Sequence, residues 1–156
     1  AAGLTRCRPL RLPASGWIPL ALLLLSAAGL ALIGIYPDRL FALLWVSPLF
    51  ILLSLQALSG RPTLLHPLRR GDWRRVVVPA LAALIFGFFW ELWNYYSLAR
   101  WTYTIPFVQR FHLFEMPVLG YGGYLPFGLE CLVAGSVIIG DPFKTVYLKE
   151  SPRGGQ

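Results

Sequence analysis

Apolar residues fill four long stretches of this chain, and short polar segments separate them. These stretches predict helices at residues 17–36, 40–58, 76–98 and 119–140. A helix of about 20 apolar residues is long enough to cross the hydrocarbon core of a bilayer, and each stretch is close to that length. The pattern therefore predicts an all-α, polytopic integral membrane protein, with four transmembrane helices in a single domain that covers residues 1–156.

The basic residues between the stretches predict how these helices are oriented. Most lysines and arginines lie in the N-terminal tail, in the loop at residues 59–75 or after residue 140, and the other three are Arg39, Arg100 and Arg110. Cytoplasmic segments of membrane proteins are enriched in Lys and Arg. We therefore expect both termini on the cytoplasmic side of a bacterial inner (plasma) membrane. Residues 1–36 also resemble a signal peptide, but their apolar run is long for one, so we expect a retained span.

The composition supports a membrane protein and indicates which kinds of molecule it binds. Hydrophobic residues make up 56% of the chain and charged residues 13%, whereas soluble domains average about 25% charged residues. The net charge of +7 would suit a protein that binds nucleic acid, but the basic residues cluster beside the apolar stretches. Such clusters ordinarily attract anionic lipid headgroups. Membrane lipids are therefore the expected partners, and nucleic acid is not.

No residue pattern in the sequence predicts a metal site or identifies a cofactor. Cys7 and Cys131 have no second cysteine or histidine at metal-ligand spacing, so we expect two free thiols. His112 and Met116 are four residues apart, a spacing that could suit a haem on a helix, but the CxxCH motif is absent. The common nucleotide, zinc-protease and hydrolase motifs are absent as well. The sequence therefore does not identify a cofactor.

Two carboxyl groups are notable because each lies inside an apolar stretch. An ionisable group in the hydrocarbon region costs roughly 2.5 to 3.5 kcal/mol on insertion scales, so it usually marks a site or a buried partner. Glu91 should share a helical face with Gly87, Asn94 and Leu98, because residues three and four apart are neighbours on a helix. Glu130 lies deeper in its stretch. We predict both glutamates as candidate catalytic groups that act as acid, base or charge stabiliser in a polar pocket.

Aromatic and polar side chains near these carboxyl groups could line that pocket. We predict ligand-binding roles for Trp90, Trp93, Asn94, Trp101, Tyr103, Tyr121, Tyr124 and His112. Residues 100–117 are too polar to span and too apolar for a free loop, so we expect an interfacial or reentrant segment there. Two structural explanations stay open. The aromatics could form a membrane-surface belt. Glu91 could pair with Arg100 or a backbone donor, and Glu130 could hydrogen-bond a tyrosine in the helix packing.

Four short motifs in this region resemble a set of uncharacterised bacterial multi-span membrane proteins. The motifs are W-E-L-W-N (90–94), W-T-Y-T-I-P (101–106), F-E-M-P-V-L-G-Y-G-G-Y (114–124) and P-F-G-L-E (126–130). A looser resemblance is to membrane-embedded carotenoid enzymes of the lycopene cyclase and hydratase type. That resemblance implies an intramembrane carboxyl, often in a Pro-x-Glu-Glu setting, that protonates an isoprenoid double bond. Here Pro126 and Glu130 are four residues apart, and no Glu-Glu pair is present.

Three functions are compatible with these features. The first is a membrane protein that binds or transforms an isoprenoid or another lipid-soluble ligand, such as a quinone or pigment, with Glu130 as the proton donor and Glu91 as a base or cation stabiliser. The second is a small accessory subunit of a respiratory or photosynthetic complex, in which the aromatic segment contacts partner chains. The third is an oligomeric transporter or channel, which the scarcity of charged residues makes the weakest of the three.

Overall fold

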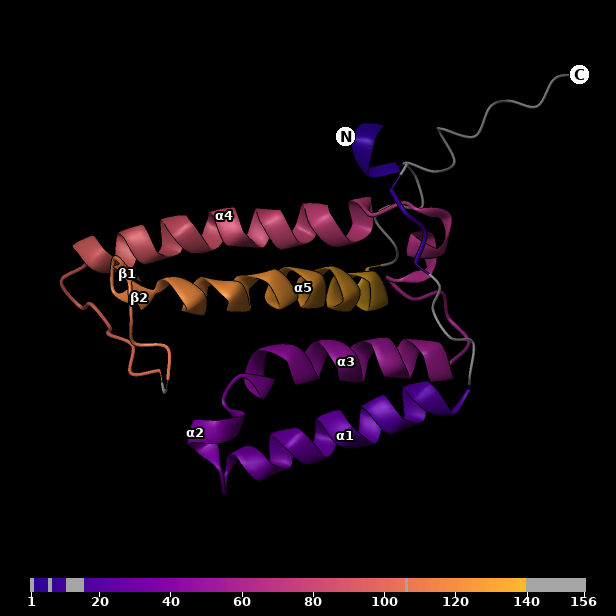
Figure 1. Cartoon of the computed structure of the whole chain (residues 1–156), viewed down its shortest axis with the longest axis horizontal. Helices are drawn as coiled ribbons and strands as arrows, with labels where there is room; N and C mark the ends of the chain where they lie inside the picture. Colours follow the sequence, from indigo (N-terminus) through magenta and orange to yellow (C-terminus); the bar gives the residue numbers. More distant parts are fainter. Residues whose placement is uncertain (1, 6, 11–15, 106, 140–156) are drawn as a thin grey trace, which may run out of the picture.

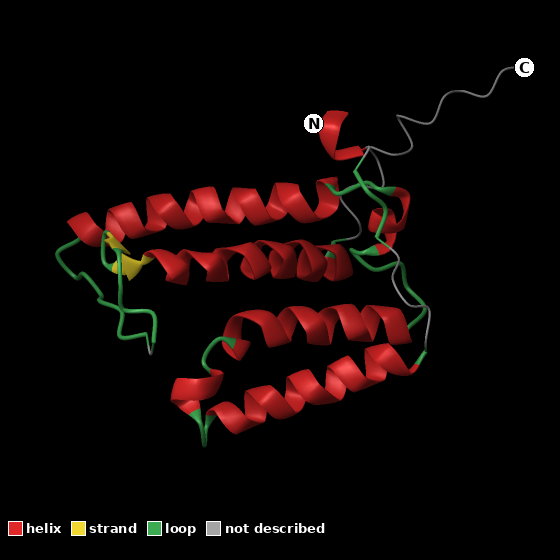
Figure 2. Ribbon diagram, viewed as in Figure 1, coloured by secondary structure: helices red, strands yellow, loops and turns green. Residues whose placement is uncertain are grey.

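The computed structural model describes residues 2–5, 7–10, 16–105 and 107–139. The predicted end of the fourth helix at residue 140 and the basic C-terminal tail lie outside these residues. Most of the described chain is helical (Figure 2), which confirms the all-α prediction. The α-helices are α1 (Trp17–Ile33), α2 (Pro37–Leu40), α3 (Leu43–Leu58), α4 (Arg74–Tyr96) and α5 (Tyr124–Ile138). Short 3-10 helices occur at η1 (Ala2–Thr5), η2 (His66–Arg70) and η3 (Val118–Gly123).

The four long helices run up and down beside one another (Figure 1). Helix α1 packs on α3, α3 packs on α5, and α5 packs on α4, so that α1 and α4 are the outer members of the row. The N-terminal residues and η2 lie at one end of the row, and α2 lies at the other. Helices that follow one another in the chain run in opposite directions, so that the neighbours α3 and α5 run in the same direction.

Only α4, among the described helices, is long and apolar enough to cross a membrane by itself. It has 23 residues, a mean hydropathy of 1.9 in its most apolar part, and only 17% of that part is buried. Helices α1 and α3 are apolar but shorter, with 17 and 16 residues. The first stretch is shortened because its helix ends before Gly34, and the last because Val118–Gly123 forms a 3-10 helix before α5 begins.

The segment between α4 and α5 contains no α-helix in its described part, so the reentrant helix considered from the sequence is absent there. Instead it forms a small antiparallel hairpin of β1 (His112–Leu113) and β2 (Met116–Pro117), followed by η3. Phe107, Phe111 and Phe114 have positive φ angles of 66°, 53° and 59°, a region that bulky residues rarely adopt. A succession of tight turns therefore holds this segment against the end of α4.

Burial in this bundle is the reverse of that in a soluble protein. Polar side chains are fully buried, among them Ser47, Ser54, Glu91 and Asn94. Large apolar side chains face outward along the helices, including Leu25 (70% exposed) and Phe86 (73% exposed). The buried apolar cluster is small and lies around α3 and α5.

Helices α4 and α5 approach closely at a glycine. A Cβ atom added to Gly128 would fall on the carbonyl oxygen of Pro79 and on the side chain of Ala83, so only glycine fits there. Gly135, seven residues or about two turns later in α5, has open space around it. Gly128 is therefore tightly packed and Gly135 is not, although both belong to α5.

We expect Gly128→Ala to destabilise the protein and Gly135→Ala to stabilise it. Overpacking typically costs about 1–3 kcal/mol, whereas replacing glycine by alanine in an open helix position gains up to about 1 kcal/mol. Thermal unfolding in detergent should therefore move in opposite directions for the two variants. A shift in the same direction for both would contradict the close approach of α4 and α5.

Candidate functional site

Glu91 lies at the centre of the candidate site. The residue is 0% exposed, and its Oε1 atom accepts hydrogen bonds from the hydroxyl groups of Tyr103 (2.6 Å) and Tyr124 (2.8 Å). The indole N–H of Trp101 donates to the Tyr103 oxygen (2.6 Å). Helix α4, the loop after it and α5 therefore meet at one carboxyl oxygen. The other oxygen of Glu91, Oε2, is also buried and has no hydrogen-bond partner among the described residues.

Asn94 positions the loop that carries two of these side chains. It is 1% exposed, its Nδ2 atom donates to the carbonyl oxygen of Trp101 (2.9 Å), and its Oδ1 atom accepts from the backbone N–H of Trp101 (2.9 Å). Because α4 ends at Tyr96, the chain turns back along the buried face of its own helix. This return brings Tyr103 to Glu91, which lies twelve residues earlier in the sequence.

Gly87 provides the space that Tyr124 needs. A Cβ atom at residue 87 would fall on the Tyr124 ring, which crosses α4 at this level. Tyr124 is the first residue of α5, and its position at the helix start lets its hydroxyl reach Glu91. Gly87, Glu91 and Asn94 are the three buried residues of α4, which confirms the predicted polar face. Leu98 lies beyond the end of the helix and is fully exposed, so its place on that face was predicted wrongly.

The hydrogen bonds at Glu91 have a defined direction. Trp101 Nε1 can only donate, so the Tyr103 oxygen accepts from it and gives its own proton to Glu91. Burial first, and then the hydrogen bond to Glu91, raise the pKa of the Tyr103 hydroxyl well above its ordinary value. The phenol therefore stays protonated at physiological pH. The remaining lone pairs of the two tyrosine oxygens are acceptors for any further group.

A groove of ≈ 850 Å³ lies beside this tyrosine pair, along α4 and α5. Its lining is mostly apolar, and its polar residues include Tyr103 and Tyr124; the other lining residues include Trp45, Pro79, Ala82, Phe86, Trp90, Trp93, Met116, Phe127, Cys131 and Leu132. Trp90 and Trp93 are 53% and 64% exposed, so the groove opens at the outer surface of the helices. Glu91 is not among the lining residues described, and it meets the groove only through the two tyrosines.

Of the eight predicted ligand-binding residues, the structure brings most of them to this region. Four of them line the groove: Trp90, Trp93, Tyr103 and Tyr124. Trp101 donates a hydrogen bond to Tyr103, and Asn94 donates one to the backbone of Trp101. Tyr121 packs beside Tyr124, with ring centroids 6.0 Å apart, but its hydroxyl donates to the Leu113 carbonyl. His112 is exposed in β1 and bonds to the Gln109 side chain, away from the tyrosine pair.

The structure does not bring Glu130 to Glu91. Glu130 is half-buried in α5, lies near the backbone of Leu49 in α3, and has a buried Oε1 atom without a partner among the described residues. Gly128, two residues away, lies against Pro79, and Pro79 is twelve residues or about 18 Å along α4 from Glu91. The two carboxyl groups therefore belong to separate places, and a catalytic role for either one stays a prediction.

The structure also shows which partner Glu91 has. Arg100 does not pair with Glu91; its Nη1 atom lies 3.1 Å from Glu115 Oε1. Glu91 instead bonds to tyrosines. Nothing in the sequence indicated Phe86 and Phe127 as groove residues, and Gly87 was placed on the face of Glu91 without a role in the groove. Gly87 could have been recognised, because a glycine one turn before a buried glutamate on the same helical face leaves space for a bulky side chain from another helix.

Neither the Glu91 site nor the groove is made of residues at metal-ligand positions. No group of three or more His, Cys, Asp or Glu side chains comes together in the described ranges. Comparisons of the chain with protein-family models, with curated proteins and with solved structures found no match.

Proposed function

We propose that the chain is a four-span membrane protein that binds a lipid-soluble ligand in the groove between α4 and α5. The ligand would be an isoprenoid alcohol or a quinol, with its hydroxyl group at Tyr103 and Tyr124. The observation that carries this proposal is the ≈ 850 Å³ apolar groove with two phenol oxygens in its lining. Sites for small molecules are typically apolar cavities of this size with a few polar groups that orient the ligand.

The membrane placement is supported by the distribution of side chains. The described helices bury Ser47, Glu91 and Asn94 while exposing Leu25 and Phe86, as expected where the surrounding solvent is hydrocarbon. The 17 residues of α1 extend about 26 Å, which is close to the thickness of a thin bilayer core. Short spans of this kind are accommodated by local thinning of the bilayer.

The charges at the two ends support the proposed orientation. The described end that holds the N-terminal residues, η2 and the start of α4 carries six arginines: Arg8, Arg61, Arg69, Arg70, Arg74 and Arg75. The opposite end carries Arg39, Arg100 and Arg110. By the positive-inside rule the first end is cytoplasmic, and the Glu91 site then faces the periplasmic side.

The direction of the hydrogen bonds supports a hydroxyl-bearing ligand. Both tyrosines point their protons at Glu91, so their oxygens accept from the ligand. A ligand hydroxyl can donate to such an oxygen, whereas a ketone or a quinone carbonyl cannot. The remaining lining is apolar and aromatic, which suits an isoprenoid chain. An isoprenoid is also the class implied by the sequence resemblance.

The proposal predicts that Ala82→Trp displaces the ligand, because Ala82 lines the groove and a tryptophan side chain there would occupy it. The wild-type protein, extracted from membranes in mild detergent, should carry a hydroxyl-bearing isoprenoid or quinol detectable by absorption and by mass spectrometry of extracted lipids. The ligand content of Ala82→Trp should fall at least about tenfold, which corresponds to 1.4 kcal/mol.

Leu81→Trp is the matched control. Leu81 is the neighbouring residue, is 50% exposed, and does not line the groove, so that variant should retain the ligand. Equal ligand loss in both variants, or recovery of the chain in the aqueous fraction after carbonate washing, would contradict the proposal. Copurification with a stable set of partner chains and no bound ligand would favour the accessory-subunit hypothesis instead.

A further inference from the structure

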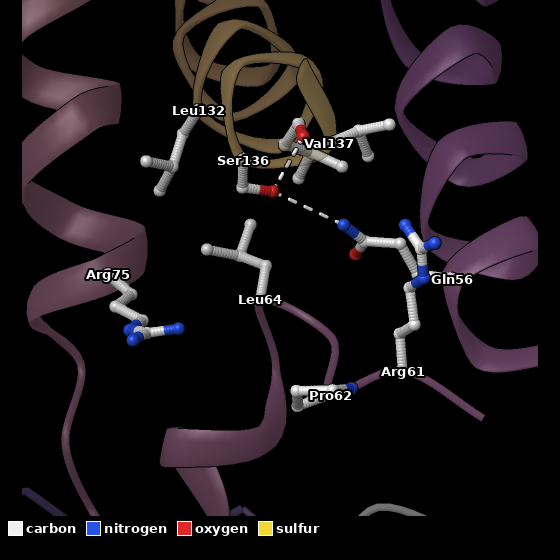
Figure 3. Close-up of a pocket in the computed structure, with 9 residues that line it drawn as sticks. Gln56, Arg61, Pro62, Leu64, Arg75, Leu132, Ser136 and Val137 are labelled. Carbon is white, nitrogen blue, oxygen red and sulfur yellow. Dashed lines mark hydrogen bonds between the residues drawn. The ribbon is translucent and has the colours of Figure 1, made fainter. Parts of the chain in front are cut away.

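A second, smaller cavity lies at the arginine-rich end of the bundle. It has a volume of ≈ 150 Å³ and is enclosed by the end of α3, the connection to α4, the start of α4 and the end of α5 (Figure 3). In contrast to the groove, it contains charged and amide side chains. Arg75 lies on one side of the cavity, and Arg61 and Gln56 lie on the other, with Leu64 between them (Figure 3).

A chain of hydrogen bonds orients the amide group in this cavity. Gln56 Nε2 donates to Ser136 Oγ (3.3 Å), and Ser136 Oγ donates to the backbone carbonyl of Val133 (2.7 Å). These bonds fix Gln56 so that its Oε1 atom is buried, and that oxygen has no donor among the described residues. A buried carbonyl oxygen without a donor is unfavourable. The cavity therefore favours a ligand that carries a hydrogen-bond donor.

The two arginines favour a ligand that also has a negatively charged group. A guanidinium has five N–H donors in a planar fork that matches phosphate oxygens, so it can bind a phosphate while keeping other contacts. The side chain of Arg61 is exposed at the mouth of the cavity, and Arg75 is half-buried inside it. Arg69 and Arg70, on the neighbouring η2, add to the positive potential around the opening.

Apolar side chains border the cavity on the side of α5. Val137 of α5 lines the cavity, is 48% exposed and does not line the groove beside α4. A ligand with its phosphate at the cavity could therefore lay an acyl chain against the exposed surface of α5, outside that groove. Soluble phosphates have no such apolar part, and basic pockets between helices at the cytoplasmic surface are typical headgroup sites.

We propose that this cavity binds the headgroup of an anionic phospholipid, with the phosphate at Arg61, positive charge from Arg75 on the far side of Leu64, and a headgroup hydroxyl at Gln56 Oε1. Phosphatidylglycerol has both groups. The inference rests on the proposed membrane placement, but it concerns a different cavity from the ligand groove, at the end of the bundle away from Tyr103 and Tyr124.

The test is retention of phosphatidylglycerol by the full chain, transferred into nanodiscs of phosphatidylcholine that contain a minor share of phosphatidylglycerol. Native mass spectrometry then counts bound lipids per protein after release from the disc. We expect Arg61→Gln to lower phosphatidylglycerol retention about tenfold, because a charge-assisted hydrogen bond to the phosphate is lost. Arg75→Gln should lower retention by a smaller factor. Gln56→Leu, which changes no charge, should lower it as well.

Arg70→Gln is the matched control, because it removes the same charge from the same end of the molecule but does not line the cavity. Equal loss of lipid in Arg70→Gln and in Arg61→Gln would overturn the proposal, since it would show general attraction to the basic surface. Stabilisation of lipid-free protein by inorganic phosphate, to the same extent as by phosphatidylglycerol, would overturn the lipid as the ligand. If Arg75→Gln fails to fold, Arg61→Gln and Gln56→Leu still decide the outcome.

The two proposals fail in different ways. Ala82→Trp alters the groove and should leave phosphatidylglycerol retention unchanged. If that variant and the wild type both lack a groove ligand while retention still depends on Arg61, the groove proposal fails and the headgroup site stands. If Arg61→Gln retains the lipid while the groove ligand is lost in Ala82→Trp, the headgroup site fails alone.

Discussion

Replacing Glu91 with leucine is expected to lower the free energy of unfolding by about 3 kcal/mol or more. Leucine fills much of the same volume but removes the acceptor for the hydroxyl groups of Tyr103 and Tyr124. Each buried donor left without a partner costs about 1–3 kcal/mol. The loss should appear as a lower thermal midpoint in detergent, together with faster proteolysis between α4 and β1, because Tyr103 would no longer hold that segment to α4.

The variant Glu91→Gln tests the role of the hydrogen-bond acceptor separately from that of the carboxyl group. Glutamine keeps one carbonyl oxygen, which can accept both phenol protons at the position of Oε1, and we expect its stability to lie within about 1 kcal/mol of wild type. Wild-type stability in Glu91→Leu would show that the tyrosine contacts contribute little. A loss in Glu91→Gln as large as in Glu91→Leu would show that the acceptor alone does not explain why a glutamate occupies this position.

The second large effect is expected at Asn94. Asn94→Ala removes both hydrogen bonds that tie the backbone of Trp101 to α4, and two lost hydrogen bonds are together worth about 2 kcal/mol. The backbone N–H of Trp101 should then exchange with deuterium much faster, while amides in the middle of α4 keep their protection. This outcome would establish that one asparagine positions the whole loop.

Ser97→Ala is the control for Asn94. Ser97 also lies at the end of α4, but its exposed hydroxyl accepts only a local bond from the Ala99 N–H (3.2 Å), so stability should change little. Asn94 and Tyr103 act on the same loop, and the combined variant Asn94→Ala with Tyr103→Phe should lose less stability than the sum of the single variants. Strict additivity would mean that the loop is held independently at the two places.

The sequence was sufficient to predict the four long helices and one buried polar face. Runs of apolar residues located four helical stretches, because hydrophobic length and periodicity are properties of neighbouring residues. The same reasoning placed Gly87, Glu91 and Asn94 together, since the helix repeat alone determines which of its residues are adjacent.

Contacts between distant parts of the chain could not be predicted in this way. The hydrogen bond between Glu91 and Tyr124 spans 33 residues and depends on where α5 begins, which is set by the 3-10 turn before it. Glu130 faces α3 rather than the groove because α5 packs between two helices, and the sequence does not show which side of α5 each neighbour covers. Arg61 and Arg75 were interpreted as part of a basic loop that sets topology and attracts anionic lipid, and the cavity that they share depends on where the helix ends lie.

The opening of the groove determines how a ligand would reach it. Trp90 and Trp93 stand at an exposed flank of α4, which in a bilayer faces the acyl chains rather than water. Exchange would then occur sideways, by lateral diffusion in the plane of the membrane. Occupancy would depend on the mole fraction of ligand among the lipids and not on its aqueous concentration, so affinities for this protein are meaningful only when expressed per lipid.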